Sequence, residues 1–174
     1  MAFNEDLAAT LRWAHIAFGI MWVGLLYFFN FIQWRILKDL QDATKKDLAP
    51  KMLHHNLLWF RMAALGTWVF GALLLWDVWD NEGYENRFRT ILIGAWLGTF
   101  MFLNVWGIIW RYQKKNLAAL NAAATSGTPV PPEAKTWVRR ATIASRTNVV
   151  LSFFMLYFMV ASTHFPNLLG KLGG

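Results

Sequence analysis

The chain has 174 residues, of which 56% are hydrophobic, 17% are aromatic and only 16% are charged. Charged residues make up roughly a quarter of an ordinary soluble domain, so this composition excludes a typical soluble protein. The length allows one domain, residues 1–174. The net charge of +7 does not favour nucleic acid as a partner, because the basic residues form short clusters between apolar runs. With no cysteine, the chain has no disulfide, thiolate metal site, iron–sulfur cluster or covalently attached c-type haem.

Four apolar stretches follow one another along the chain, at about residues 7–37, 55–79, 91–115 and 143–164. A helix needs about 20 mostly apolar residues to cross a hydrocarbon core of about 30 Å, and each stretch is long enough. None of them carries polar residues at every turn, as the exposed face of a soluble helix would. The sequence therefore predicts an all-α fold, a bundle of four transmembrane helices.

The segments between these stretches differ in character. A polar linker covers residues 38–51, and an acidic tight turn covers residues 77–83. A loop rich in Pro, Gly and Ser covers residues 125–132, and the basic segment 135–146 leads into the fourth stretch. The N-terminal residues lack the basic start of a cleavable signal peptide, so we expect the first helix to direct insertion.

The basic residues divide unequally between the two sides that four crossings define. One side has four of the 17: Arg12, Arg87, Arg89 and Lys171. The other side has thirteen: Arg35, Lys38, Lys45, Lys46, Lys51, Arg61, Arg111, Lys114, Lys115, Lys135, Arg139, Arg140 and Arg146. Because basic residues stay cytoplasmic, we expect a multi-pass protein of the bacterial inner membrane, with both termini and the turn near residue 80 in the periplasm.

Two histidines are placed to share a ligand near the periplasmic side. His15 lies some eight residues into the first helix, ~12 Å along its axis, and His164 ends the fourth helix on the same side. Two imidazoles from two helices at similar depth are the axial ligands of a b-type haem. The alternative is structural, because a transmembrane histidine also bonds a neighbouring helix and a terminal one also lies among headgroups.

The residues around His15 fit the same interpretation. Gly19 is one turn further along the same helix face and would leave room for a flat macrocycle, and Trp22 follows on that stripe. Arg12, three residues before His15, is placed to pair with a haem propionate. We therefore predict one haem b, with His15 and His164 as iron ligands and with Arg12, Gly19 and Trp22 as further contacts.

Other polar and small residues carry weaker signals. His54 and His55 begin the second apolar stretch on the cytoplasmic side, where solvation explains them better than iron ligation, although they stay alternative ligands. Arg61, Arg146 and Asn148 lie near that side and suit a propionate, a quinone head group or an anion, or simply extend toward the interface. Gly94 and Gly98 have the spacing of close helix contacts, which predicts packing and no chemistry.

The sequence resembles one family of membrane domains. Residues 12–15 (RWAH), 19–24 (GIMWVG) and 27–30 (YFFN) resemble the first helix of bacterial membrane-bound urate hydroxylases, the urate oxidase N-terminal domain family. Similar motifs follow in order in the other three stretches: 59–61 (WFR), 67–75 (TWVFGALLL), 104–106 (NVW), 113–115 (QKK), 146–148 (RTN), 158–159 (FM) and 164–166 (HFP). The resemblance implies a shortened four-helix relative of that membrane domain.

The chain departs from the family pattern at three positions near the cytoplasmic side. Leu58 and Thr147 stand where the family has histidines, and Ala63 stands where it has an acidic residue. His15 and His164 remain, which implies that an outer haem site is kept and an inner one is lost. The fused cytochrome c domain of the family is absent from this sequence, so the resemblance does not imply urate hydroxylation by this chain alone.

We therefore expect a b-type cytochrome-like membrane subunit that transfers electrons between the lipid bilayer and a periplasmic cytochrome c or other partner. One alternative is a cofactor-free accessory subunit of a larger membrane complex. Another is an oxidoreductase subunit for urate or a similar molecule, working with a separate cytochrome c. Whether the chain is itself an enzyme, and whether it forms a homodimer, stay open at this stage.

Overall fold

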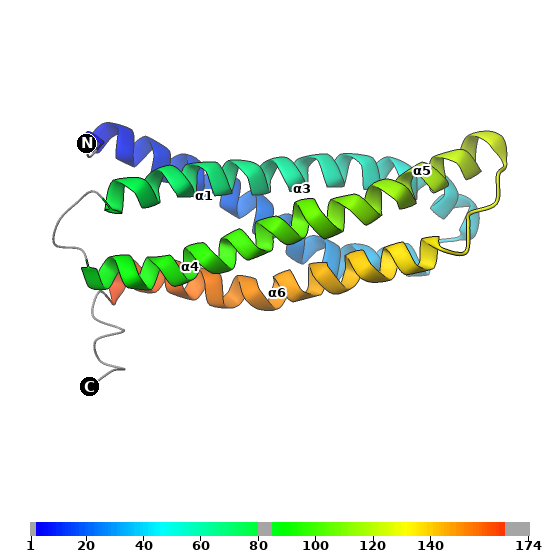
Figure 1. Cartoon of the computed structure of the whole chain (residues 1–174). Coiled ribbons are helices and arrows are strands. Elements are labelled where there is room, and N and C mark those ends of the chain that lie inside the picture. The colour runs from blue at the N-terminus through cyan, green and yellow to red at the C-terminus, as the bar shows by residue number, and fades with distance from the viewer. Residues whose placement is uncertain (1–2, 80–84, 166–174) are drawn as a thin grey trace.

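The computed structural model of the protein describes residues 3–79 and 85–165, without the side chains of residues 42, 46 and 85–87. Every regular element in this part of the chain is a helix, and the helices lie side by side along one long axis (Figure 1). In chain order they are α1 (Glu5–Tyr27), η1 (Phe28–Gln33), α2 (Trp34–Asp39), α3 (Asp42–Trp79), α4 (Glu85–Asn104), η2 (Val105–Ile109), α5 (Trp110–Ser126) and α6 (Ala134–His164), where η1 and η2 are π-helical segments.

These elements form four continuous helical segments, each long and apolar enough to cross a membrane. They cover Glu5–Asp39, Ala43–Trp79, Phe88–Ser126 and Ala134–His164, with mean hydropathies of 1.7, 1.6, 1.7 and 1.5 in their most apolar windows. The two π-helical segments widen the first and third helices without ending them. The predictions of an all-helical fold and of four candidate membrane spans are therefore confirmed.

The helix ends follow from local sequence. Asn4 precedes α1, and its side chain accepts a hydrogen bond from the backbone N–H of Leu7 at 2.8 Å. Glu5 and Asp6 in the first turn complement the positive end of the helix dipole. After α5, Gly127 has a φ of 65°, a left-handed conformation that a residue with a side chain adopts only at a cost.

The helices are longer than the apolar stretches of the sequence. Where a polar linker was expected at 38–51, only Leu40 and Gln41 separate α2 from α3, and α3 continues through Pro50. The third helical segment likewise extends to Ser126. These additions mix polar residues with alanines and leucines, which favour a helix without forming a long apolar run, so a search for hydrophobic runs does not detect them. Part of the expected acidic turn at 77–83, Pro166 of the HFP motif and Lys171 of the periplasmic basic residues lie outside the described residues.

We call the end of the bundle that holds the start of α1, the end of α3 and the end of α6 the terminal end, and the opposite end the basic end (Figure 1). α1 packs chiefly against α3, and α4 packs chiefly against α6. In the second pair the glycines face α6, since a Cβ built on Gly94 would lie 3.2 Å from Met159 Cε and one on Gly98 would lie 3.9 Å from Met155 Cγ. The small residues of α4 therefore lie at a helix contact, as the spacing predicted.

The core is apolar with one buried amide network. Trp22 from α1, Phe60 from α3 and Met101 from α4 are among its largest buried side chains. Asn148 on α6 is 0% exposed. It accepts from Asn104 Nδ2 at 2.9 Å and donates to the Met101 carbonyl at 3.0 Å, so the amides join α4 to α6 at mid-bundle.

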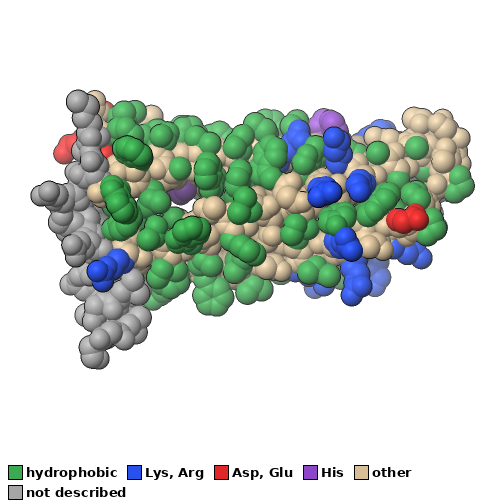
Figure 2. Space-filling model, viewed as in Figure 1, with side chains coloured by type: hydrophobic (Ala, Val, Ile, Leu, Met, Phe, Trp, Pro, Cys, Tyr) green, Lys and Arg blue, Asp and Glu red, His purple; other side chains and the backbone are tan. Residues whose placement is uncertain are grey.

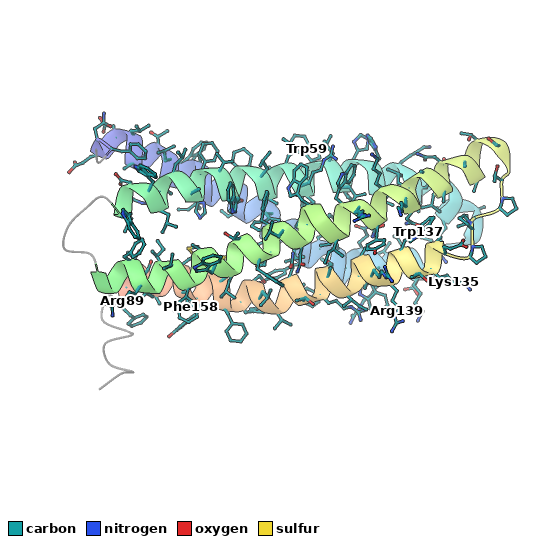
Figure 3. All side chains as sticks on the ribbon, viewed as in Figure 1. Trp59, Arg89, Lys135, Trp137, Arg139 and Phe158 are labelled. Carbon is teal, nitrogen blue, oxygen red and sulfur yellow. The ribbon has the colours of Figure 1, made fainter. Side chains whose placement is uncertain are left out.

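Charge and apolar surface are separated along the axis. Apolar side chains cover most of the visible face toward the terminal end, and the Lys and Arg side chains gather toward the basic end (Figure 2). Lys135, Trp137 and Arg139 lie at the basic end of α6, whereas Arg89 and Phe158 lie near the terminal end (Figure 3). Trp76 and Trp79, at the terminal end of α3, are 69% and 74% exposed, as expected of aromatic side chains at a membrane boundary.

Candidate functional site at His15

His15 is held against the backbone of α3. Its Nδ1 lies 2.8 Å from the carbonyl oxygen of Thr67. Because a carbonyl oxygen only accepts hydrogen bonds, Nδ1 carries the proton and donates it. In the neutral imidazole this leaves a lone pair on Nε2. Such a bond from one ring nitrogen to a backbone carbonyl is the arrangement that orients a metal-ligating histidine.

Gly71 makes this contact possible. A Cβ built on Gly71 would lie 2.8 Å from His15 Cε1 and 3.0 Å from His15 Nδ1, which is too close for an unshifted ring. Gly71 follows Thr67 by one helical turn, so its missing side chain exposes the Thr67 carbonyl to α1. The stripe of α3 that carries these two residues therefore forms the seat of the His15 ring.

The other predicted residues of α1 take different positions. Gly19 also faces α3, where an added Cβ would meet Thr67 Cγ2 at 3.8 Å, an ordinary packing distance. Trp22 is 2% exposed, and its buried Nε1 has no hydrogen-bond partner among the described residues. Arg12 is exposed. Trp22 is thus a buried donor that lacks an acceptor, whereas Gly19 is explained by the packing of α1 on α3.

Contacts across the bundle locate the level of His15 along α6. Trp68, which follows the carbonyl that His15 binds, donates from Nε1 to Thr99 Oγ1 on α4 at 3.2 Å. The neighbouring Gly98 faces Met155 on α6. His15 therefore lies roughly level with Met155.

His164 lies nearer the terminal end than this. It is the last residue of α6, nine residues beyond Met155, which corresponds to ~13 Å of helix rise. Its side chain is exposed. The described arrangement therefore does not bring the two predicted iron ligands together, and the ligand pair stays a prediction.

The terminal half of the bundle leaves space between its two helix pairs. Figure 2 shows an opening between the upper and lower helices of this half, with a histidine side chain (purple) at its rim. The side-chain hydrogen bonds described between α1 and α6, such as Tyr27 Oη to Ser152 Oγ at 2.9 Å, lie further toward the basic end. A flat cofactor placed between the pairs at this opening would lie beside one imidazole.

The alternative histidines lie far from this opening. His54 and His55 are both exposed near the basic end of α3, with their rings 5.3 Å apart in an edge-to-face arrangement. Among the described residues, no group of three or more His, Asp or Glu side chains is arranged to hold a metal ion. Of the described histidines, His15 alone is tied by a ring nitrogen to another helix.

A second hollow lies at the basic end, where all four helical segments meet. Its volume is about 410 Å³. Its polar lining consists of amides, hydroxyls and one cation: Asn30, Gln33, Asn56, Gln113, Asn116, Thr142, Ser145 and Arg146. Several of these bond to each other, for example Asn56 Nδ2 to Gln33 Oε1 at 2.9 Å. The sequence analysis identified only Arg146 of this set, because single amides on separate helices carry no spacing signal.

The chain matches no family model, and no curated protein or solved structure is significantly similar to it. The resemblance to the urate oxidase N-terminal domain family therefore stays a prediction from its motifs.

Proposed function

We propose that the protein is a b-type cytochrome-like subunit of the membrane, and that it transfers electrons with a haem bound near its terminal end. One observation carries the proposal. The His15 ring is fixed through Nδ1 to the Thr67 carbonyl, which leaves Nε2 as the free nitrogen. The ring fits there because Gly71 of the opposite helix has no side chain.

Of the two predicted iron ligands, His15 is better placed than His164 to bind a haem. His15 would hold the iron through Nε2, and Thr67 would set the tautomer and the direction of the ring. Trp22 offers a buried N–H to an acceptor on the bound group. His164 would become the second ligand only if the last turns of α6 moved toward the basic end. When bound, the haem would supply one-electron redox chemistry, and the helices would exclude water from it.

The visible spectrum of purified variants tests this proposal. We expect His15→Ala to abolish haem binding or to leave a weakly held haem with an altered Soret band. His164→Ala separates the two ligand arrangements, because loss of the low-spin spectrum indicates two histidine ligands and an unchanged spectrum indicates His15 alone.

His54→Ala and His55→Ala are the matched controls, since both residues are exposed at the opposite end of the bundle. Both should keep the wild-type spectrum. An unchanged spectrum in His15→Ala, together with its loss in either control, would contradict the proposal.

A cofactor-free accessory subunit is the second candidate, and one observation favours it. The hydrogen bond to Thr67 already satisfies one nitrogen of His15. His164 lies ~13 Å beyond the level of His15 along the bundle axis, whereas two ligands of one iron would lie at the same level. A wild-type protein purified from haem-replete cells without any haem would favour this candidate.

The proposal places the terminal end in the bacterial periplasm, because thirteen of the 17 basic residues belong to the opposite side. A periplasm-active reporter should work when it is fused after Gly174 or inserted near Asn81, and should fail near Gly127. An active reporter near Gly127 with a silent one after Gly174 would reverse the orientation.

A further inference from the structure

Arg61 is a cation at membrane depth without an acidic partner. It lies on α3, 18 residues before Trp79, which corresponds to ~27 Å of helix rise from the exposed aromatic end of that helix. Since the hydrocarbon core is ~30 Å thick, Arg61 lies about where the core ends on the basic side. In the described part of the chain, no Asp or Glu side chain forms an ion pair with it.

Two tryptophans of the third helical segment form a platform for this arginine. The guanidinium carbon lies 3.9 Å from the centre of the Trp110 ring and 5.9 Å from the centre of the Trp106 ring. Trp106 and Trp110 are one helical turn apart, so both rings lie on the same face of the third helical segment, the face toward α3. Stacking holds the guanidinium in place but leaves its N–H groups unused.

Two buried donors of this cluster lack acceptors. Among the residues that the structure describes, neither Arg61 Nε nor Trp106 Nε1 has a hydrogen-bond partner, and both atoms have almost no solvent-exposed surface. An unsatisfied buried donor costs ~1–3 kcal/mol, and more when the group is charged. An oxyanion is the acceptor that suits a guanidinium, because its charge strengthens the hydrogen bond.

We propose that the cluster of Arg61, Trp106 and Trp110 binds the phosphate of an acidic phospholipid from the leaflet at the basic end. A lipid phosphate lies at the depth of Arg61, where a soluble anion would have to leave water. Binding turns the partly buried Arg61 side chain, so that the phosphate oxygens accept from its guanidinium and from Trp106 Nε1, and the tryptophan rings contact the glycerol and the upper acyl chains. Arg61 precedes Thr67 by six residues on α3, so the two proposals are kept apart by their readouts, since lipid retention is measured without any haem.

Lipid retention measured by native mass spectrometry tests the site. The delipidated protein is offered dioleoylphosphatidylglycerol, zwitterionic dioleoylphosphatidylcholine or inorganic phosphate. We expect the acidic lipid to bind at least about tenfold more tightly than the zwitterionic one. Arg61→Gln should weaken binding of the acidic lipid about tenfold or more, since it removes a charged hydrogen bond.

Trp106→Phe keeps an aromatic ring but removes the indole N–H. It should weaken binding of the same lipid about threefold while leaving the fold intact. If Arg61→Gln does not fold, Trp106→Phe tests the proposal by itself. Arg111→Gln and Trp59→Phe are matched controls at exposed positions, and both should bind as the wild type does.

Three outcomes would overturn the proposal. One is equal retention of the two lipids, and a second is wild-type retention by both Arg61→Gln and Trp106→Phe. The third is competition by millimolar inorganic phosphate, which would identify the ligand as a free anion instead of a lipid.

Discussion

The two halves of this bundle are held together by different means. Toward the terminal end, glycines bring helices into contact: Gly66 and Gly71 lie against α1, and Gly94 and Gly98 lie against α6. Toward the basic end, the helices are joined by side-chain hydrogen bonds, such as Asn30 Nδ2 to Ser145 Oγ at 2.7 Å. The glycine contacts lie within the pairs, whereas some of the hydrogen bonds toward the basic end, such as that of Asn30 to Ser145, connect one pair to the other.

The difference explains where a cofactor site fits. In the terminal half, α1 is fastened to α3 by His15 and by the stacking of Phe18 on Phe70, whose ring centres are 5.6 Å apart. α6 is fastened to α4 there. At that level no described side-chain hydrogen bond joins α1 to α6, and the pairs are linked on the α3–α4 side by the bond from Trp68 to Thr99.

The largest loss of stability is expected in the amide network. Asn148→Leu conserves volume but removes two hydrogen bonds and leaves the Asn104 amide without its partner. We expect it to lower the free energy of unfolding by ~2–3 kcal/mol, measured by thermal or denaturant unfolding in detergent. Thr147→Val is the matched control, because that exposed side chain bonds only its own helix. Equal stability of the two variants would show that the network does not join α4 to α6.

Glycine packing in the terminal half should be nearly as sensitive. Gly98→Leu places a large side chain against Met155, and overpacking of this kind costs ~1–3 kcal/mol. Gly107→Leu is the control, since nothing lies within 4 Å of a Cβ built there. Thermal stability in detergent should fall for the first variant and stay unchanged for the second. A stable Gly98→Leu protein would mean that this contact is loose.

Displacement of the His15 ring should cost less stability but should remove function. Gly71→Ala forces the ring away from the Thr67 carbonyl, for an expected ~1–2 kcal/mol. Gly66→Ala makes a similar clash, with its Cβ 2.5 Å from Phe18 Cδ1, and so controls for packing alone. Haem content should fall in Gly71→Ala and persist in Gly66→Ala. Equal haem content in both variants would show that the position of the His15 ring against Gly71 does not affect cofactor binding.

The smallest effect is expected for one hydrogen bond between the pairs. Ser145→Ala removes the acceptor of Asn30, and such bonds between membrane helices contribute ~0.6 kcal/mol on average. Asn30 keeps its bond to the Leu26 carbonyl, which limits the loss further. Thermal unfolding should therefore shift slightly toward lower temperature. A loss as large as that of Asn148→Leu would show that this bond alone holds α1 against α6.

The fold was readable from the sequence because the membrane constrains it strongly. Apolar runs near 20 residues identify spans directly, and they located all four. The extensions were missed for the same reason, since residues 116–126 favour a helix through their Ala and Leu content without forming a strongly apolar run.

The candidate site was readable only in part. A lone histidine in an apolar stretch is a signal by itself, so His15 was found. Its partners Thr67 and Gly71 were not assigned to it, because the rotation of α1 against α3 decides which carbonyl the ring meets. Gly19 was assigned to cofactor space, but in the structure it faces Thr67, a contact that one helix face viewed alone does not reveal.

The haem content of the wild-type protein tests the central claim most directly. The protein is purified from membranes of haem-replete cells, and its haem is quantified as the pyridine complex relative to the protein concentration. We predict a ratio close to one b-type haem per chain, with an absorption band that changes on reduction. A ratio near zero in a folded, monodisperse preparation would contradict the claim.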